Sequence, residues 1–253
     1  MIYVFLFIVG ACLGSFALVI GQRLPINKDA VSSRSECDNC HHILSWWELI
    51  PIVSYIILLG KCHHCHKHIS AVNPIMEIAL GSLFVYSYYI FGISYQFFGF
   101  CIITTLMLII FVSDFTYYII NDSPLLVSGI MLFMLQLIYY GWGYAFSHLI
   151  SGLVLFLIML LIKFIGDSMF KKESLGGGDI KLSFVMGLAT GIQIGLCSLI
   201  LSTFLALPYS IASIMLKKNN EVPYGPFLAA SLFITFLFVD KFQSLLDLIF
   251  ISV

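Results

Sequence analysis

The segment Gly176-Gly177-Gly178-Asp179-Ile180-Lys181 places three glycines and a carboxylate between two long apolar stretches. Non-helical backbone at membrane depth persists only where protein buries it or where it lines a wet cavity. An ionisable side chain at that depth indicates a functional site. The alternative interpretation is a flexible connector in which Asp179 caps the first turn of the following helix. Which interpretation holds depends on what surrounds the segment.

The composition shows what kind of protein surrounds it. Hydrophobic residues make up 60% of the 253 residues, charged residues make up 10%, and the mean hydropathy is +1.04. A soluble domain contains about 25% charged residues. We therefore expect an all-α polytopic integral membrane protein in a lipid bilayer. The net charge of -1 gives no electrostatic argument for binding nucleic acid or an acidic ligand.

Apolar runs long enough to span a membrane follow one another along the chain. The first run has no basic region before it and no clear cleavage site, so we expect a retained helix and not a removed signal peptide. With a short run at 180–190, which is either spanning or re-entrant, the sequence predicts about eight transmembrane helices. A tail after Lys241 is expected at the membrane surface. The predicted spans are 1–20, 69–91, 94–113, 123–140, 145–164, 180–190, 192–216 and 224–239.

Positive charge lies in the loops between these runs and at the span ends that adjoin them. If the longest loop, 21–68, is cytoplasmic, eleven of the 12 Lys and Arg residues fall on that side, and Lys241 is the exception. Positive charge is retained on the cytoplasmic side of membrane proteins. We therefore expect both termini outside. The other loops expected on the cytoplasmic side are 114–122, 166–179 and 217–223.

The loop 21–68 contains two Cys-x-x-Cys pairs, Cys37 with Cys40 and Cys62 with Cys65. Four thiolates can surround one ion tetrahedrally, which is the arrangement of structural zinc sites. A reducing cytoplasm disfavours disulfides, so we predict a structural zinc ion, with disulfides or redox-active thiols as alternatives. Six histidines in the same loop are interpreted as supporting or solvated groups. Replacement of a ligand or a second metal is their alternative role.

Three carboxylates lie at predicted membrane edges. Glu77 stands at the start of the second span, Asp114 ends the third and Asp179 opens the sixth. If Asp114 and Asp179 meet at the cytoplasmic edge, one keeps a proton while the other activates a water, which is what metal-free peptide hydrolysis requires. Gly177 and Gly178 would then let a substrate backbone approach.

The spacing alone leaves the meeting of the two acids open. Asp114 could be an ordinary helix-end residue at the interface, and Glu77 could be the partner of a polar group on a neighbouring span.

Several short stretches occur together in one order along the chain. They are Gly14-Ser15-Phe16, Arg23-Leu24-Pro25, the two cysteine pairs enclosing Ile50-Pro51-Ile52-Val53-Ser54 and Leu59-Gly60-Lys61, Pro74-Ile75-Met76-Glu77, Asp114 with Asp122, Gly176 to Leu182, and Val222 to Ala229. In this order they resemble the type IV prepilin peptidase family, the GxGD membrane aspartic peptidases. The resemblance runs from about Gly10 to Ala230.

The resemblance implies that Asp114 and Asp179 are a catalytic pair, in a membrane aspartic peptidase core at 69–240 within a single membrane domain, 1–253. The loop 21–68 is then an insertion between the first two spans. Gly176, Gly177, Gly178 and Lys181 belong to one family motif, and Glu77 and Asp122 to others. We interpret Lys181 as an interfacial anchor and not as a catalyst.

The resemblance also implies a substrate. In a bacterial cytoplasmic membrane, the enzyme would remove a short basic leader from type IV prepilins, pseudopilins or competence pilins. Cleavage would follow a glycine, before the apolar helix, on the cytoplasmic side. Many family members also methylate the new N-terminus with S-adenosylmethionine, an activity associated with the first cytoplasmic loop and its flanks.

Four departures from the family pattern leave every carboxylate and thiolate in place. Ala17-Leu18 replaces Leu-Asn, Asp38 replaces proline, Asn73 replaces tyrosine, and Asn121 replaces the proline before Asp122. The first two lie in or beside the region linked to methylation, so they weaken the prediction of that activity. The alternative function is a metal-handling transporter, which would place acids of several spans around a pore near the midplane. A membrane scaffold, the other alternative, would need neither Asp114 nor Asp179.

Overall fold

The computed structural model describes residues 1–30, 34–37, 39–171, 173–215 and 222–251. This part of the chain contains helices and two isolated β-bridges but no strand, which confirms the predicted all-α class. The helices form two compact units, residues 1–93 and 94–253. Asp38 and most of the predicted loop 217–223 lie outside the described residues. The predicted division into an inserted loop and a core at 69–240 stays a prediction.

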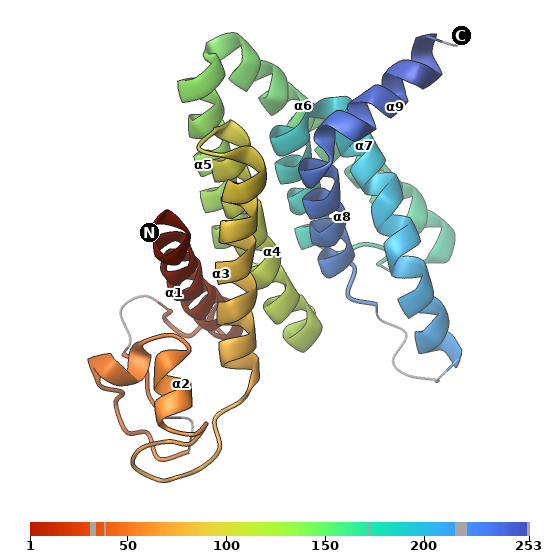
Figure 1. Ribbon diagram of the computed structural model, residues 1–253. Coiled ribbons are helices and arrows are strands. Elements are labelled where there is room, and N and C mark those ends of the chain that lie inside the picture. The colour runs from red at the N-terminus through yellow and green to blue at the C-terminus, as the bar shows by residue number, and fades with distance from the viewer. Residues whose placement is uncertain (31–33, 38, 172, 216–221, 252–253) are drawn as a thin grey trace. The chain divides into compact units, whose positions relative to one another are not determined.

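The first unit is built on two long apolar helices, α1 (Ile2–Arg23) and α3 (Val72–Phe91) (Figure 1). The two helices pack closely because small residues face each other: a Cβ added to Gly10 would lie 2.8 Å from Gly81 Cα. Such small-residue contacts let helix backbones approach in a membrane. In the described part of the segment between α1 and α3, the chain forms three short helices. They are η1 (Leu24–Ile26), η2 (Trp46–Leu49) and α2 (Val53–Ile57).

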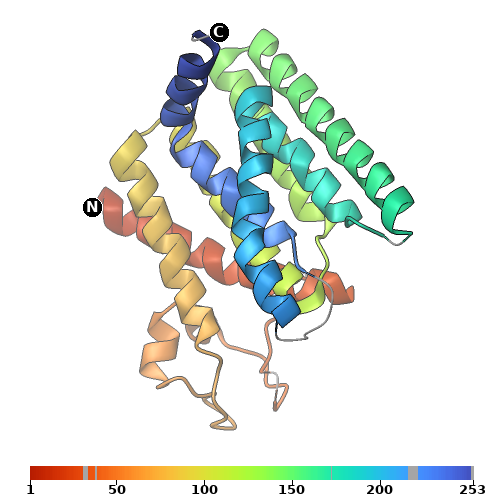
Figure 2. The ribbon, with the colours of Figure 1, turned by 90° about the vertical axis from the view of Figure 1, so that its right-hand side faces the viewer.

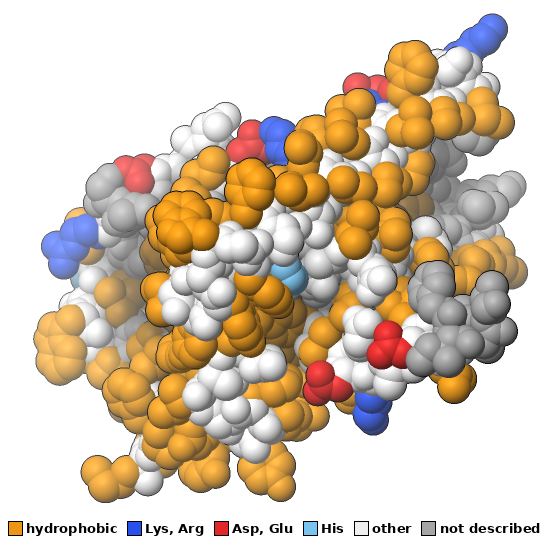
Figure 3. All heavy atoms as spheres, turned by 90° about the horizontal axis from the view of Figure 1, so that it is seen from above, with side chains coloured by type: hydrophobic (Ala, Val, Ile, Leu, Met, Phe, Trp, Pro, Cys, Tyr) orange, Lys and Arg blue, Asp and Glu red, His pale blue; other side chains and the backbone are white. Residues whose placement is uncertain are grey.

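The second unit contains the remaining six helices. They are α4 (Tyr95–Tyr117), α5 (Asp122–Tyr140), α6 (Trp142–Phe170), α7 (Gly177–Met215), α8 (Gly225–Leu237) and α9 (Val239–Ile251). Its interior is apolar, with Phe100, Leu182, Leu188 and Leu232 almost completely buried. Large apolar side chains also cover the outside of the helices (Figure 3), which is expected where lipid and not water surrounds them.

Helix α7 is a helical hairpin and not one straight helix. Gly191 has φ 77° and ψ 176°, far from helical values, and a Cβ added to Gly195 would lie 3.5 Å from Gly187 Cα. In a straight helix, eight residues span about 12 Å along the axis. The chain therefore turns back at Gly191, and Figure 2 shows the two arms of α7 meeting there. The arms correspond to the predicted segments 180–190 and 192–216.

A buried polar group closes the end of the first arm. The turn leaves the last carbonyls of this arm without helical partners. Gln136 Nε2 on α5 donates to Leu188 O at 2.6 Å, and His148 Nδ1 on α6 lies 3.1 Å from the same oxygen. Gln136 is completely buried. The cap therefore holds the first arm of α7 against two neighbouring helices.

Among the described residues, six helices are long and apolar enough to cross a membrane, and the bent pair α8 and α9 would make a seventh. If the two arms of α7 are counted separately, the number becomes the predicted eight. The multi-span membrane class is thus confirmed, whereas the number eight stays a prediction.

We predict that Gly191→Ala lowers the free energy of unfolding by about 1–3 kcal/mol, because its backbone conformation is one that only glycine adopts without strain. Space is not the limiting factor, since an added Cβ would meet only the His148 ring, with its nearest atom, Cε1, at 3.5 Å. Equilibrium unfolding in detergent, followed by circular dichroism, measures the change. The control is Gly129→Ala in α5, where the Cβ meets Leu188 Cδ2 at 3.8 Å and should be neutral or stabilising. Equal stability of the two variants would contradict the strained turn.

Candidate active site and metal centre

Asp114 lies in the last turn of α4 and is only 6% exposed. Its Oδ2 accepts a hydrogen bond from the backbone N–H of Gly225 at 3.1 Å. Gly225 begins α8, so the start of one helix holds the acid at the end of another. The N-terminal N–H groups of a helix are free to bind an anion in this way.

Asp179 lies in the first turn of α7 and is 8% exposed. One carboxyl oxygen, Oδ2, is held close to Gly176, where an added Cβ would lie 3.2 Å from it. The other oxygen, Oδ1, is buried and has no hydrogen-bond partner among the described residues. A buried acceptor without a partner costs about 1–3 kcal/mol, so this oxygen can gain from binding water or a substrate N–H.

The structure brings the two acids together. Ile120 lies against both Gly178, the neighbour of Asp179, and Gly225, whose N–H binds Asp114, although 65 positions separate the two acids in the sequence. Tyr224, which precedes Gly225, also interacts with Asp179 and shares a 2.7 Å hydrogen bond with Ser202 on the second arm of α7. The ends of α4, α7 and α8 thus converge at one place. A catalytic role for the pair stays a prediction.

The glycines of this site differ in what surrounds them. An added Cβ on Gly177 would meet no atom within 4 Å, whereas one on Gly178 would lie 2.6 Å from Ile120 Cβ. Gly178 is therefore required by packing within the chain, and Gly177 is the open position. The predicted approach of a substrate is consistent with the space at Gly177, but the space at Gly178 is already occupied by Ile120.

Ile120 lies at this site, and the sequence analysis did not identify it as a candidate site residue. The available signal was an apolar residue in a short turn between two motif acids, Asp114 and Asp122. Such a residue is as common in ordinary turns as in functional ones, so the signal is weak.

Lys181 and Asp122 form an ion pair at the outer edge of the site. Lys181 Nζ lies 2.7 and 2.6 Å from the two oxygens of Asp122, and both side chains are at least half exposed. An exposed ion pair contributes about 0–1 kcal/mol to stability. The pair links the starts of α5 and α7, which fits the predicted anchoring role of Lys181.

Glu77 is buried in the first unit, where its carboxyl is hydrogen-bonded to residues of two other motifs. Its Oε2 accepts from the N–H of Ile52 at 2.7 Å, and its carboxyl is also hydrogen-bonded to Ser15 on α1. Ile52 has a positive φ of 64°, which is unfavourable for a β-branched residue. Glu77 therefore fixes a strained turn of the loop to α1 and α3. This geometry fits the interpretation of Glu77 as the partner of a polar group on a neighbouring span.

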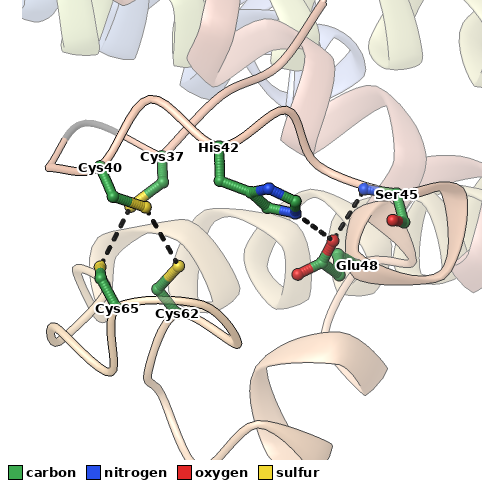
Figure 4. Close-up of polar contacts among 7 residues, drawn as sticks. All are labelled: Cys37, Cys40, His42, Ser45, Glu48, Cys62 and Cys65. Atoms are coloured by element: carbon green, nitrogen blue, oxygen red, sulfur yellow. Dashed lines mark hydrogen bonds and ion pairs between the residues drawn. The ribbon is translucent and has the colours of Figure 1, made fainter.

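The four cysteines of the loop form one cluster (Figure 4). Their sulfur atoms lie within 4.8 Å of one another, with 3.8 Å from Cys37 to Cys65 and 4.0 Å from Cys40 to Cys62. Disulfide sulfurs would be about 2 Å apart. Four thiolates around one zinc ion at about 2.3 Å are separated by roughly 3.8 Å. The spacing therefore fits a shared metal ion and not disulfides.

The two cysteine pairs have the same backbone fold. In each pair the first cysteine accepts a backbone hydrogen bond from a residue with positive φ, His41 for Cys37 and His66 for Cys62. A hydrogen bond from the backbone N–H of Lys67 lowers the pKa of the Cys65 thiol to about 6, and backbone N–H groups also lower the pKa of Cys37. Desolvation and the neighbouring thiols raise the pKa of Cys40 to about 12, so the four thiols differ in how readily they ionise without a metal. Thiolates are the metal-binding form of cysteine.

The histidines take supporting positions. His42 stacks on His64 and its Nε2 lies 3.9 Å from Glu48, whose carboxylate accepts from the N–H of Ser45 at 2.7 Å (Figure 4). Among the described residues, only the four cysteines form a group that could hold a metal. The predicted supporting role fits these positions.

Two family models match the chain, one in each unit. The bacterial peptidase A24 N-terminal domain matches residues 8–91, and the type IV leader peptidase family matches residues 101–211. No solved structure matches this chain.

Curated relatives match nearly the whole chain. A prepilin leader peptidase/N-methyltransferase of Bacillus subtilis is 30% identical over 94% of this chain and 95% of its own length. A protein of the same name from Vibrio cholerae is 30% identical over 93% of this chain and 96% of its own length. One from Myxococcus xanthus is 32% identical over 73% of this chain and 55% of its own length. With the motif order and the helical membrane fold, these matches show that the chain belongs to the type IV leader peptidase family.

Proposed function

We propose that this protein is a membrane aspartic endopeptidase that removes the leader from prepilins or prepilin-like proteins. The observation that carries the proposal is the meeting of two buried carboxyl groups, Asp114 and Asp179, beside glycine backbone at three helix ends. Family membership supports the same reaction. The alternative of a metal-handling transporter is not supported by the family, whose relatives are named as peptidases.

The surroundings of the two acids suggest which one acts as the general base and which one as the general acid. Asp114 accepts from Gly225 N–H at a helix start, which favours its ionised form, so Asp114 can take the proton of the attacking water. Asp179 is buried and its Oδ1 has no partner among the described residues, so it can keep a proton, because two carboxyl groups at one site do not both ionise readily. The water oxygen adds to the peptide carbonyl carbon. The C–N bond then breaks as the leaving nitrogen takes a proton from the acid.

The class of substrate and the kind of membrane are proposed from the resemblance to the family. The proposed cleavage lies on the cytoplasmic side of a bacterial cytoplasmic membrane, after a glycine, with both termini of the enzyme outside. The cleaved proteins would be type IV prepilins, pseudopilins or competence pilins, so pilus assembly, secretion and DNA uptake are all compatible with the reaction.

We further propose that Cys37, Cys40, Cys62 and Cys65 hold one structural zinc ion. The proposal is supported by the closeness of their four sulfur atoms, which lie within 4.8 Å of one another, and a structural role by the lack of an open position when four thiolates bind. Such an ion would stabilise the loop and take no part in peptide hydrolysis.

A second activity, methylation of the new N-terminus, is supported by the names of the relatives. S-adenosylmethionine would supply the methyl group. We assign no binding residues to it, because no group of described side chains in the loop identifies an adenosyl site.

We predict that Asp114→Asn and Asp179→Asn each slow leader removal by about 10³-fold or more, because neither amide can exchange the required proton. Coexpression with a prepilin-like substrate, followed by gel mobility of the processed form, measures the rate. Asp240→Asn, an exposed acid on α9, is the matched control and should process normally. Processing at the wild-type rate by either of the first two variants would refute the pair.

We predict one zinc ion per chain in the wild type and almost none in Cys62→Ser. The affinity for zinc should fall as the pH drops, because protons compete with the metal for the four thiolates. Metal analysis of protein purified under reducing conditions tests both points, with Cys12→Ser in α1 as a control that keeps the metal. Wild-type protein without zinc would exclude the site.

We predict that the mature substrate gains the mass of one methyl group when S-adenosylmethionine is supplied. Mass spectrometry of its N-terminus measures this, and a reaction without the methyl donor is the control. An unmodified amine after complete cleavage would leave the peptidase as the sole activity.

A further inference from the structure

Ile120 lies in the short turn between α4 and α5, and so between Asp114 and Asp122 in the sequence. Tyr118 ends α4 in the left-handed conformation, with φ 56°. This residue turns the chain back across the helix end. The turn therefore carries an isoleucine side chain to the acid site.

The Ile120 side chain contacts the backbone on both sides of the site. A Cβ on Gly178 would lie 2.6 Å from Ile120 Cβ, and a Cβ on Gly225 would lie 2.5 Å from Ile120 Cδ1. Non-bonded carbon atoms prefer separations of about 3.5–4.0 Å. Ile120 therefore fills the space between the segment that precedes Asp179 and the segment that holds Asp114, and both segments need glycine beside it.

Unused hydrogen-bonding groups lie near Ile120. Asp179 Oδ1 and Asn121 Nδ2, the latter on the residue next to Ile120, are buried and without a partner among the described side chains. A peptide group offers one N–H donor and one C=O acceptor. An extended substrate strand could therefore present a C=O to Asn121 Nδ2 beside the Asp179 carboxyl, and its backbone would then lie against Ile120.

We propose that Ile120 determines specificity, by excluding residues larger than glycine from the position before the cleaved bond. The inference rests on the proposed peptidase function. Two backbone segments of this chain already need glycine where they meet the Ile120 side chain. A third backbone strand lying there, the substrate, meets the same restriction. A substrate residue with a Cβ must displace Ile120, whereas glycine need not.

The test compares two substrates in membranes containing the full-length enzyme. One prepilin-like substrate has glycine before the cleaved bond, and the other has alanine there. Ile120→Ala should raise the ratio of kcat/KM for the alanine substrate to that for the glycine substrate by about tenfold or more, since pocket changes of this size give such factors. Ile120→Val, which removes one methyl group, should give a smaller increase.

Ile119→Ala is the matched control, because Ile119 neighbours Ile120 but is 45% exposed, and it should leave the ratio unchanged. An unchanged ratio in Ile120→Ala, with the glycine substrate still cleaved, would overturn the role of Ile120 and leave the peptidase proposal standing. Loss of cleavage of both substrates by both Ile120 variants, with normal amounts of folded protein, would also overturn it. If the wild type leaves the glycine substrate intact, the proposed function itself fails, and the specificity role fails with it.

Discussion

Two carboxyl groups can be buried among apolar helices only if backbone groups replace the water they lose. In this protein the replacement comes from helix starts that lack side chains: Gly225 donates its N–H to Asp114, and Gly176 lies against Asp179. A Cβ on Gly225 would lie 2.9 Å from Asp114 Oδ2, so any other residue would push the acid away. The glycines are therefore needed for close approach as much as for flexibility. The helix ends in turn must arrive at the same place, and this requirement shapes the second unit.

The hairpin of α7 meets that requirement for Asp179. The first arm has only 14 residues, from Gly177 to Thr190, which is about 20 Å of helix. Asp179 stands at one end, and the cap of Gln136 and His148 on Leu188 O stands at the other. A short arm fixed at its far end by two other helices has little freedom to tilt. The polar cap, remote from the acids, thus contributes to their geometry.

The sequence predicted the helical membrane class and the cysteine cluster, because these depend on composition and spacing. It also singled out Asp114 and Asp179 by motif order, and their catalytic role stays a prediction. It did not predict the contacts of Ile120 or the hydrogen bond from Ile52 to Glu77. Those contacts join segments that are remote in the sequence, and periodicity carries no information about which remote segments meet. The sequence could not distinguish the surroundings of Gly177 from those of Gly178 for the same reason. Two adjacent glycines look alike until the residue that packs on one of them is known.

The loop between α1 and α3, unlike the long helices, buries few side chains that could stabilise its fold. Between residues 21 and 68, the described residues that are buried are few: Gly21, Ala30, Glu48, Gly60 and Cys62. Such a segment gains little free energy from apolar burial. Small domains with so small a core depend on disulfides or bound metals for stability. In this loop, the four-cysteine cluster offers a metal site, and the hydrogen bond from Ile52 N–H to Glu77 ties the loop to α3. Because four thiolates leave a zinc ion no open position, a metal in the cluster would act through the folding of the loop and not through the chemistry of hydrolysis.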